Sequence, residues 1–177
     1  MDSLVLAAIG AGAVALVFAF WRSVWIKKQD PGNQALQEIG AAVREGAMAF
    51  LAREYKVLSV FVLLAAIVLV ALNKSELQLV GASFLVGAVC SALAGFFGMR
   101  VATQANMRTA NSARNGLNAA LRVAFTGGSV MGLCVVGLGL LGLSVLYVVF
   151  TNMWGTDLAV VNGRVLPVLS GFSLGAS

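Results

Sequence analysis

The chain has 177 residues, of which 60% are hydrophobic and 11% are charged, and its mean hydropathy is +0.93. Soluble domains carry roughly 45–50% apolar and about 25% charged residues, so this composition excludes an ordinary soluble fold. The sequence contains no histidine, which excludes catalytic triads and zinc sites built on that residue. The net charge is +5. We attribute it to the cytoplasmic loops of a membrane protein and expect no nucleic-acid partner.

Uncharged runs divide the chain into helices that could cross a lipid bilayer, which requires ~20 apolar residues. The sequence predicts an all-α, polytopic transmembrane helix bundle that forms a single membrane domain over 1–177. The first run is not a cleavable signal peptide, because no basic leader precedes it and cations follow it. The last run has thirteen residues and is too short to span, so we expect the chain to stop in mid-helix. The approximate spans are 3–24, 57–73, 77–99, 126–150 and the incomplete 165–177.

Lysine and arginine residues are distributed unevenly between the two sides of these spans. Two of them, Lys74 and Arg164, fall on one side, and ten fall on the other. Because cytoplasmic loops carry an excess of Lys and Arg, the bias predicts that loops 25–56 and 100–122 are cytoplasmic and that the N-terminus is outside. We expect an integral multi-pass protein of a bacterial inner membrane. The ten residues are Arg22, Lys27, Lys28, Arg44, Arg53, Lys56, Arg100, Arg108, Arg114 and Arg122.

Both cytoplasmic loops have a helical pattern next to the spans. After the turn residues 30–33, apolar residues recur close to a period of 3.6, and no breaker precedes the second span. The sequence therefore predicts one helix over 34–72, about 58 Å long at ~1.5 Å per residue. The third span continues into the cytoplasm to about 114, before the turn signal Asn115-Gly116. Residues 73–76 are expected to join the two long helices as an antiparallel hairpin.

Arginines on the third helix define a cationic face. Arg100, Arg108 and Arg114 fall within about 120° of one another on a helical wheel, and Arg122 joins them if the helix is continuous. One interpretation is a solvated face that obeys the positive-inside rule. The other is a face that attracts an anionic substrate.

Small residues repeat every four positions inside the spans. The rows are Ser83, Gly87, Ser91 and Gly95 in the third span and Gly128 and Gly132 in the fourth. Such rows let helix backbones approach closely in lipid, so we expect both to face neighbouring helices. Gly137, Gly139 and Gly142 match a dinucleotide-binding pattern, but no strand precedes them, and close helix contact explains them better.

The acidic residues do not form a recognisable site. All seven lie at helix ends or in connections, and their spacing does not suggest a magnesium cluster. We therefore predict no catalytic, substrate-binding or metal-binding residue in this chain. The seven are Asp2, Asp30, Glu38, Glu45, Glu54, Glu76 and Asp157.

Several segments resemble the membrane-integral, ion-pumping inorganic pyrophosphatases. The segments GMRVATQAN at 98–106, RTA at 108–110 and GGSVMGL at 127–133 are similar to the third and fourth helices of that family. Glu38-Ile39, Glu45-Gly46-Ala47, Phe50-Leu51 and Glu54 resemble its second helix. Ser170-Gly171-Phe172 and Leu174-Gly175 resemble the start of its fifth.

This resemblance implies a sixteen-helix homodimeric pump that hydrolyses magnesium pyrophosphate in the cytoplasm and moves protons, or in some members sodium, outward. The family's aspartate-rich site begins after the fifth helix, so the resemblance makes this chain an outer-ring scaffold and places the Mg²⁺ ligands elsewhere. Ser177 aligns with a family serine near the ion gate, although a packing role is common for serine at tight helix contacts. The alternative is a small non-enzymatic membrane scaffold or assembly subunit.

Overall fold

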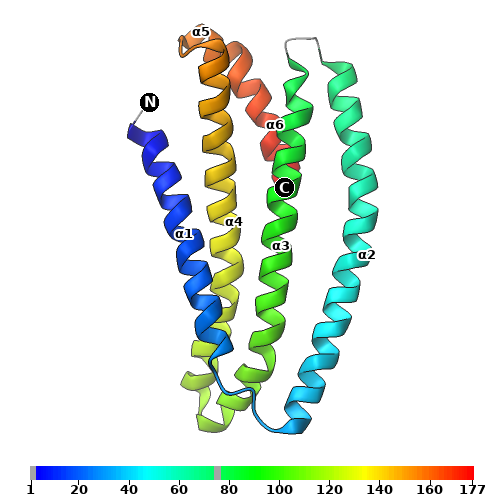
Figure 1. The fold of residues 1–177 in the computed structure, drawn as a ribbon, viewed down its shortest axis with the longest axis vertical. Coiled ribbons are helices and arrows are strands. Elements are labelled where there is room, and N and C mark those ends of the chain that lie inside the picture. The colour runs from blue at the N-terminus through cyan, green and yellow to red at the C-terminus, as the bar shows by residue number, and fades with distance from the viewer. Residues whose placement is uncertain (1–2, 74–76) are drawn as a thin grey trace.

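The computed structural model describes residues 3–73 and 77–177 and shows a bundle of long helices (Figure 1). All regular elements within these ranges are helical, which confirms the predicted all-α helix bundle. Five helical stretches of the described residues are long and apolar enough to cross a membrane. The elements are α1 (Ser3–Lys27), α2 (Gln34–Leu72), α3 (Leu79–Ser112), η2 (Ala113–Asn115), α4 (Leu117–Trp154), α5 (Leu158–Val160), η3 (Val161–Val165) and α6 (Leu166–Ala176).

The bounds of α2 match the helix that the sequence predicts over 34–72. Asn33 forms the N-cap, and its side-chain oxygen accepts a hydrogen bond from the Leu36 backbone N–H at 3.0 Å. Gly32 precedes it with a φ of 86°, a left-handed conformation that favours glycine. The helix then runs without interruption from a charged half into an apolar half. Residues 74–76 of the expected hairpin link lie outside the described residues.

The long third helix also ends where the turn signal predicts. α3 continues to Ser112, and one turn of 3₁₀-helix leads to Gly116, whose φ is 110°. The chain then reverses into α4, as the lower part of Figure 1 shows. Arg122 therefore lies on α4, so the continuous helix that would place it on one face with Arg100 does not form. The turn at Gly116 ends the continuous helix that the helical wheel assumes.

The last helix begins earlier than the predicted incomplete span over 165–177. Helical structure starts at Leu158 and continues through a π-helical turn at Val161–Val165 into α6. The predicted span starts at Val165 because Arg164 precedes it, but one charged residue near a helix end does not stop a helix. The resulting stretch over 158–176 has 19 residues and is long enough to cross a membrane.

Helix α3 occupies the centre of the bundle, with α2 and α4 on either side of it in Figure 1. It packs against α2, α4 and α6, and α1 packs against α4. One apolar core joins α1, α3 and α4 and includes Ile26, Val101 and Val130. A second core joins α3, α4 and the last helix and includes Phe150, Val165 and Val168. The outer surfaces remain rich in exposed apolar side chains, as expected for helices that face lipid or further helices.

Helices α3 and α6 approach each other closely at two glycines. A Cβ atom at Gly87 would overlap the Phe172 carbonyl oxygen and lie 2.9 Å from the Ala176 nitrogen. On the opposite side, Gly175 is in the same position against the backbone of Phe84. Neither backbone could approach so closely with a larger residue, so these glycines set the distance between α3 and α6.

The predicted small-residue rows are partly correct. In α3, Ser83 and Gly87 are buried, as expected for residues that face a neighbouring helix, whereas Ser91 is exposed. In α4, a Cβ atom at Gly128 or Gly132 would have nothing within 4 Å among the described residues, so no helix of the described chain packs on this row. Spacing alone identifies a helix face with small side chains, but it does not determine whether that face points toward another helix of the chain.

The glycine pattern at 137–142 does mark close helix contacts. A Cβ atom at Gly137 would lie 3.1 Å from the Gly12 carbonyl oxygen, so α1 and α4 cross closely there. At Gly142 a Cβ atom would lie 2.6 Å from the Phe172 ring. Gly139 has open space beside it, so two of the three glycines serve packing.

Candidate functional site

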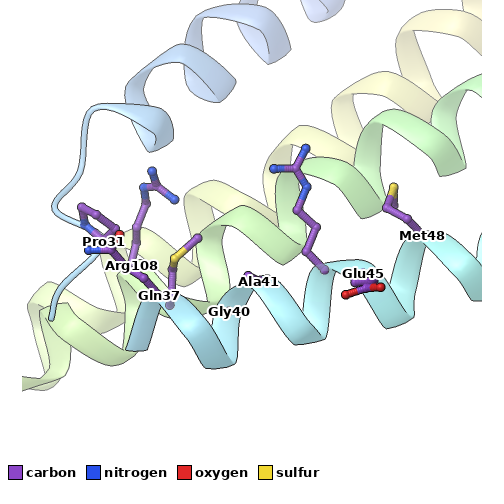
Figure 2. Close-up of a pocket in the computed structure, with 9 residues that line it drawn as sticks. Pro31, Gln37, Gly40, Ala41, Glu45, Met48 and Arg108 are labelled. Carbon is purple, nitrogen blue, oxygen red and sulfur yellow. The ribbon is translucent and has the colours of Figure 1, made fainter. Parts of the chain in front are cut away.

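A cavity of about 490 Å³ lies between the charged half of α2, α3 and the α1–α2 connection (Figure 2). Figure 2 shows Arg108 beside Pro31 at one end of the cavity and Met48 at the other, with Gly40 and Ala41 along α2 between them. A Cβ atom at Gly40 would lie 3.0 Å from the Met107 side chain, so glycine lets α2 approach α3 here. The lining residues are Pro31, Gln37, Gly40, Ala41, Arg44, Glu45, Met48, Met107 and Arg108.

The connection between α1 and α2 closes one end of this cavity with a turn. The Asp30 carboxylate accepts a hydrogen bond from the Gly32 backbone N–H at 2.9 Å, and the Gly32 carbonyl accepts one from the Gln37 side chain at 2.7 Å. Short polar side chains commonly hold turns through such bonds to nearby backbone groups. The Asn111 side chain of α3 donates to the Asp30 carbonyl at 3.4 Å, which ties the turn to α3.

Arg108 links α3 to the end of α1 and to the connection that follows it. Its Nε donates to the Gln29 carbonyl at 3.0 Å, Nη1 to the Gln104 carbonyl at 2.8 Å and Nη2 to the Lys27 carbonyl at 3.4 Å. Lys27 is the last residue of α1, and the final carbonyls of a helix have no partners within the helix. The cationic guanidinium therefore bonds to a free carbonyl at the C-terminus of α1, which is the negative end of that helix dipole. Partial burial lowers the pKa of Arg108 from its ordinary value.

The structure separates the arginines that the helical wheel grouped together. Arg100 and Arg114 are exposed, whereas Arg108 is half-buried and bonded to backbone carbonyls. Arg122 lies over the Trp25 ring with its Cζ atom 5.5 Å from the ring centroid, and so contributes to the contact between α4 and α1. Of the predicted anion-attracting residues, Arg100 and Arg114 are thus the two with exposed side chains.

Ser177 is exposed at the end of α6, and its hydroxyl donates to the Leu174 carbonyl at 3.0 Å. This local bond to a carbonyl three residues earlier is common for serine at helix ends. Its family-derived role near an ion gate stays a prediction.

The described acidic residues do not converge on a point where they could hold magnesium. Within residues 3–73 and 77–177, no three His, Cys, Asp or Glu side chains lie close enough together to hold a metal ion. Glu38, Glu45 and Glu54 are exposed along α2, and helical rise separates neighbours in this series by ~10 Å or more. A magnesium ion with a phosphate ligand needs carboxylates that converge on one point. We therefore assign no magnesium ligand to these residues.

A hydrogen bond at Tyr55 that the sequence pattern did not predict joins α2 to α3. The Tyr55 hydroxyl donates to the Ala92 carbonyl at 2.5 Å, across 37 residues of sequence. A Cβ atom at Gly95 would lie 2.9 Å from this hydroxyl, so glycine makes room for it. The sequence signal was present as Gly95 in the small-residue row, but its partner could not be read from spacing. The bond fixes α2 against α3 where the charged half of α2 meets its apolar half.

Comparison with known proteins gives the family of the chain. Residues 13–177 match the inorganic H+ pyrophosphatase family. A relative from Clostridium tetani, whose name describes a K(+)-stimulated pyrophosphate-energized sodium pump, is 41% identical over all of this chain and 24% of its own length.

Two further relatives are named as K(+)-insensitive pyrophosphate-energized proton pumps. The protein from Methanosarcina mazei is 38% identical over all of this chain and 24% of its own length. The protein from Moorella thermoacetica is 43% identical over 94% of this chain and 23% of its own length. The chain thus spans about a quarter of the length of these relatives. It is an integral, multi-pass membrane protein chain that belongs to the inorganic H+ pyrophosphatase family.

Proposed function

We propose that residues 1–177 form the N-terminal part of a membrane pyrophosphatase that couples cytoplasmic hydrolysis of pyrophosphate to outward transport of protons or sodium ions. The observation that carries this proposal is the family match over 13–177. The matched range includes most of the first long helix and all of the later ones. The names of the relatives divide between sodium and proton pumps, so the proposal leaves the ion open. We further propose a homodimer in a bacterial inner membrane, with the N-terminus outside.

Within such a pump these residues act mainly as a scaffold. Helix α3 packs against three other helices, and Arg108 and Tyr55 fix it to α1 and α2 by hydrogen bonds. Catalysis of phosphoryl transfer depends on charged groups that are held rigidly where charge develops. A rigid layer of helices supports such a site without supplying its ligands. Magnesium and pyrophosphate would bind to residues outside this chain.

The scaffold assignment predicts that the 177-residue chain alone does not hydrolyse pyrophosphate. The purified chain in detergent with excess magnesium should release phosphate at the uncatalysed rate, because attraction to scattered cations binds ground and transition states alike. Release above this background that a magnesium chelator abolishes would refute the scaffold assignment.

The pump assignment requires a second measurement, on membrane vesicles from cells that express the coding sequence read past Ser177. Addition of magnesium pyrophosphate should produce phosphate release together with acidification of the vesicle lumen or uptake of sodium. Vesicles that show neither activity would refute the pump. A stop codon directly after Ser177 would favour a small membrane scaffold instead.

The two exposed arginines of α3 provide a finer proposal. We propose that Arg100 and Arg114 contribute to a positive field that attracts the anionic substrate. In the active pump, replacement of both by Gln should raise the apparent KM for pyrophosphate at low salt and leave kcat unchanged. An unchanged KM at low ionic strength would refute this role, since long-range attraction is strongest there.

A further inference from the structure

A groove of about 630 Å³ runs along one face of α2, separate from the cavity described above. Its lining residues are Arg53, Lys56, Val57, Val60, Phe61 and Leu64. Their spacing of three and one residues places them on a single stripe of the helix. The stripe begins with two cations and continues with four large apolar residues.

This stripe points away from the rest of the bundle. Tyr55 and Ala66 face α3, since Tyr55 bonds to Ala92 and the Ala66 carbonyl would lie 3.2 Å from a Cβ atom at Gly81. Val57 and Val60 are 63% and 59% exposed, so nothing in the described chain covers them. Within the described chain, neither Arg53 nor Lys56 has a side-chain hydrogen bond or ion pair. The groove thus presents two cations without a hydrogen-bond or ion-pair partner in the described chain, beside an apolar surface that no described residue covers.

The order of these residues matches the order of groups in a phospholipid. The cations lie at the start of the predicted span over 57–73, where the headgroups of a bilayer would be. From Lys56 to Leu64 the helix rises ~12 Å, which carries the apolar part of the stripe into the hydrocarbon region. Basic side chains near the membrane surface attract anionic headgroups. We propose that this groove binds an anionic phospholipid, with its phosphate at Arg53 and Lys56 and an acyl chain along Val57, Val60, Phe61 and Leu64.

The two cations favour lipid over a further helix of the longer protein as the occupant of the groove. Large apolar side chains alone do not separate the two occupants, because helices of this chain also pack through large residues such as Ile26 and Phe150. Arg53 and Lys56 at the start of the stripe, by contrast, match an anionic headgroup at the membrane surface. This inference depends on the proposed membrane position of α2 and not on the pump activity.

The binding experiment uses the 177-residue chain in nanodiscs of phosphatidylcholine with phosphatidylglycerol added. Native mass spectrometry after release should show retained phosphatidylglycerol. Replacement of Arg53 and Lys56 by Gln should weaken retention about thirtyfold, which corresponds to ~1 kcal/mol for each cation. The matched control replaces Arg44 and Arg100, two exposed cations outside the groove, by Gln and should retain the lipid as the unmodified chain does. Circular dichroism checks that all variants remain helical.

Retention that is equal in the two double variants would overturn the proposal, as would equal retention of phosphatidylcholine. Glycerol 3-phosphate, which has no acyl chain, should not compete. Competition by it would show a phosphate site without the acyl-chain groove and would also overturn the proposal.

A second experiment tests the groove within the longer protein. A photoreactive benzoylphenylalanine replaces Val60 in the protein expressed in cell membranes, and irradiation should link it to lipid. A link to another polypeptide segment would overturn the proposal, because it would show that a helix covers the groove. Failure of the pump assay would leave both readouts unchanged, so the two proposals can fail separately.

Discussion

The substitution Gly87→Ala tests the packing of α3 against α6 with a single methyl group. The new Cβ atom would overlap the Phe172 carbonyl oxygen and lie 2.9 Å from the Ala176 nitrogen, whereas ordinary contacts of such atoms fall at 3.4–4 Å. The neighbouring atoms belong to backbone, so no side-chain rotation can relieve the overlap and the helices must separate. Overpacking of this kind costs ~1–3 kcal/mol. We expect a value at the upper end, about 3 kcal/mol, because both backbones are helical and rigid.

Gly132→Ala is the matched control for this experiment. A Cβ atom at Gly132 has nothing within 4 Å, and both positions lie inside long helices, so the gain in helix propensity is the same for each. The difference between the two variants therefore isolates the overlap. A difference of about 3 kcal/mol lowers the ratio of folded to unfolded protein by a factor on the order of one hundred.

The free energy of unfolding is measured in mixed micelles by circular dichroism as denaturing detergent is added. Gly175→Ala repeats the test from α6, where the new atom would overlap the Phe84 carbonyl oxygen. Equal unfolding free energies for Gly87→Ala and Gly132→Ala would refute the argument, and so would a greater loss from Gly132→Ala.

Three further predictions follow from the polar contacts and the charge bias. Arg108→Gln should lower the free energy of unfolding by ~1.5 kcal/mol, because its bonds to the carbonyls of residues 27 and 29 are lost. The control Arg100→Gln, at an exposed site, should change the free energy of unfolding by less than about 0.5 kcal/mol. Equal effects of the two substitutions would contradict the carbonyl contacts. Tyr55→Phe should cost ~1 kcal/mol by the same assay, and no loss would mean that water or lipid replaces the bond. In a background without reactive cysteines, a cysteine at Gln34 should react with impermeant reagents from the cytoplasm and one at Thr156 from outside, and the reverse pattern would overturn the topology.

Helix limits could be predicted well where local chemistry marks them. Asn33 caps α2 with its own side chain, and Gly116 ends the turn after α3 in a conformation that other residues rarely adopt. The cap and the glycine turn each depend on a few neighbouring residues, so the local sequence is enough to predict them. The start of the last helix at Leu158 was missed because the predicted run was started after the charged residue Arg164 and not at a capping or turn signal.

The candidate site could be predicted less well, because its contacts join distant parts of the chain. The wheel groups Arg108 with Arg100 and Arg114, whereas two of the three carbonyls that it bonds belong to residues 27 and 29, about 80 positions earlier. Every residue has a backbone carbonyl, so the residue type does not show which carbonyls Arg108 bonds. The pairing of Tyr55 with Ala92 has the same character.

The sequence by itself determined the membrane class, the long helices and the family, because these depend on composition, local periodicity and matched segments. Only the tertiary structure decided that, among the described residues, Gly87 contacts a neighbouring helix while Gly132 does not, and that one stripe of α2 faces away from the other described helices. The physical reason lies in the solvent. In water, the polar face of a helix shows which side is exposed, but a membrane helix is apolar all round and lacks that signal. Its rotation is set by close packing against helices that are distant in sequence.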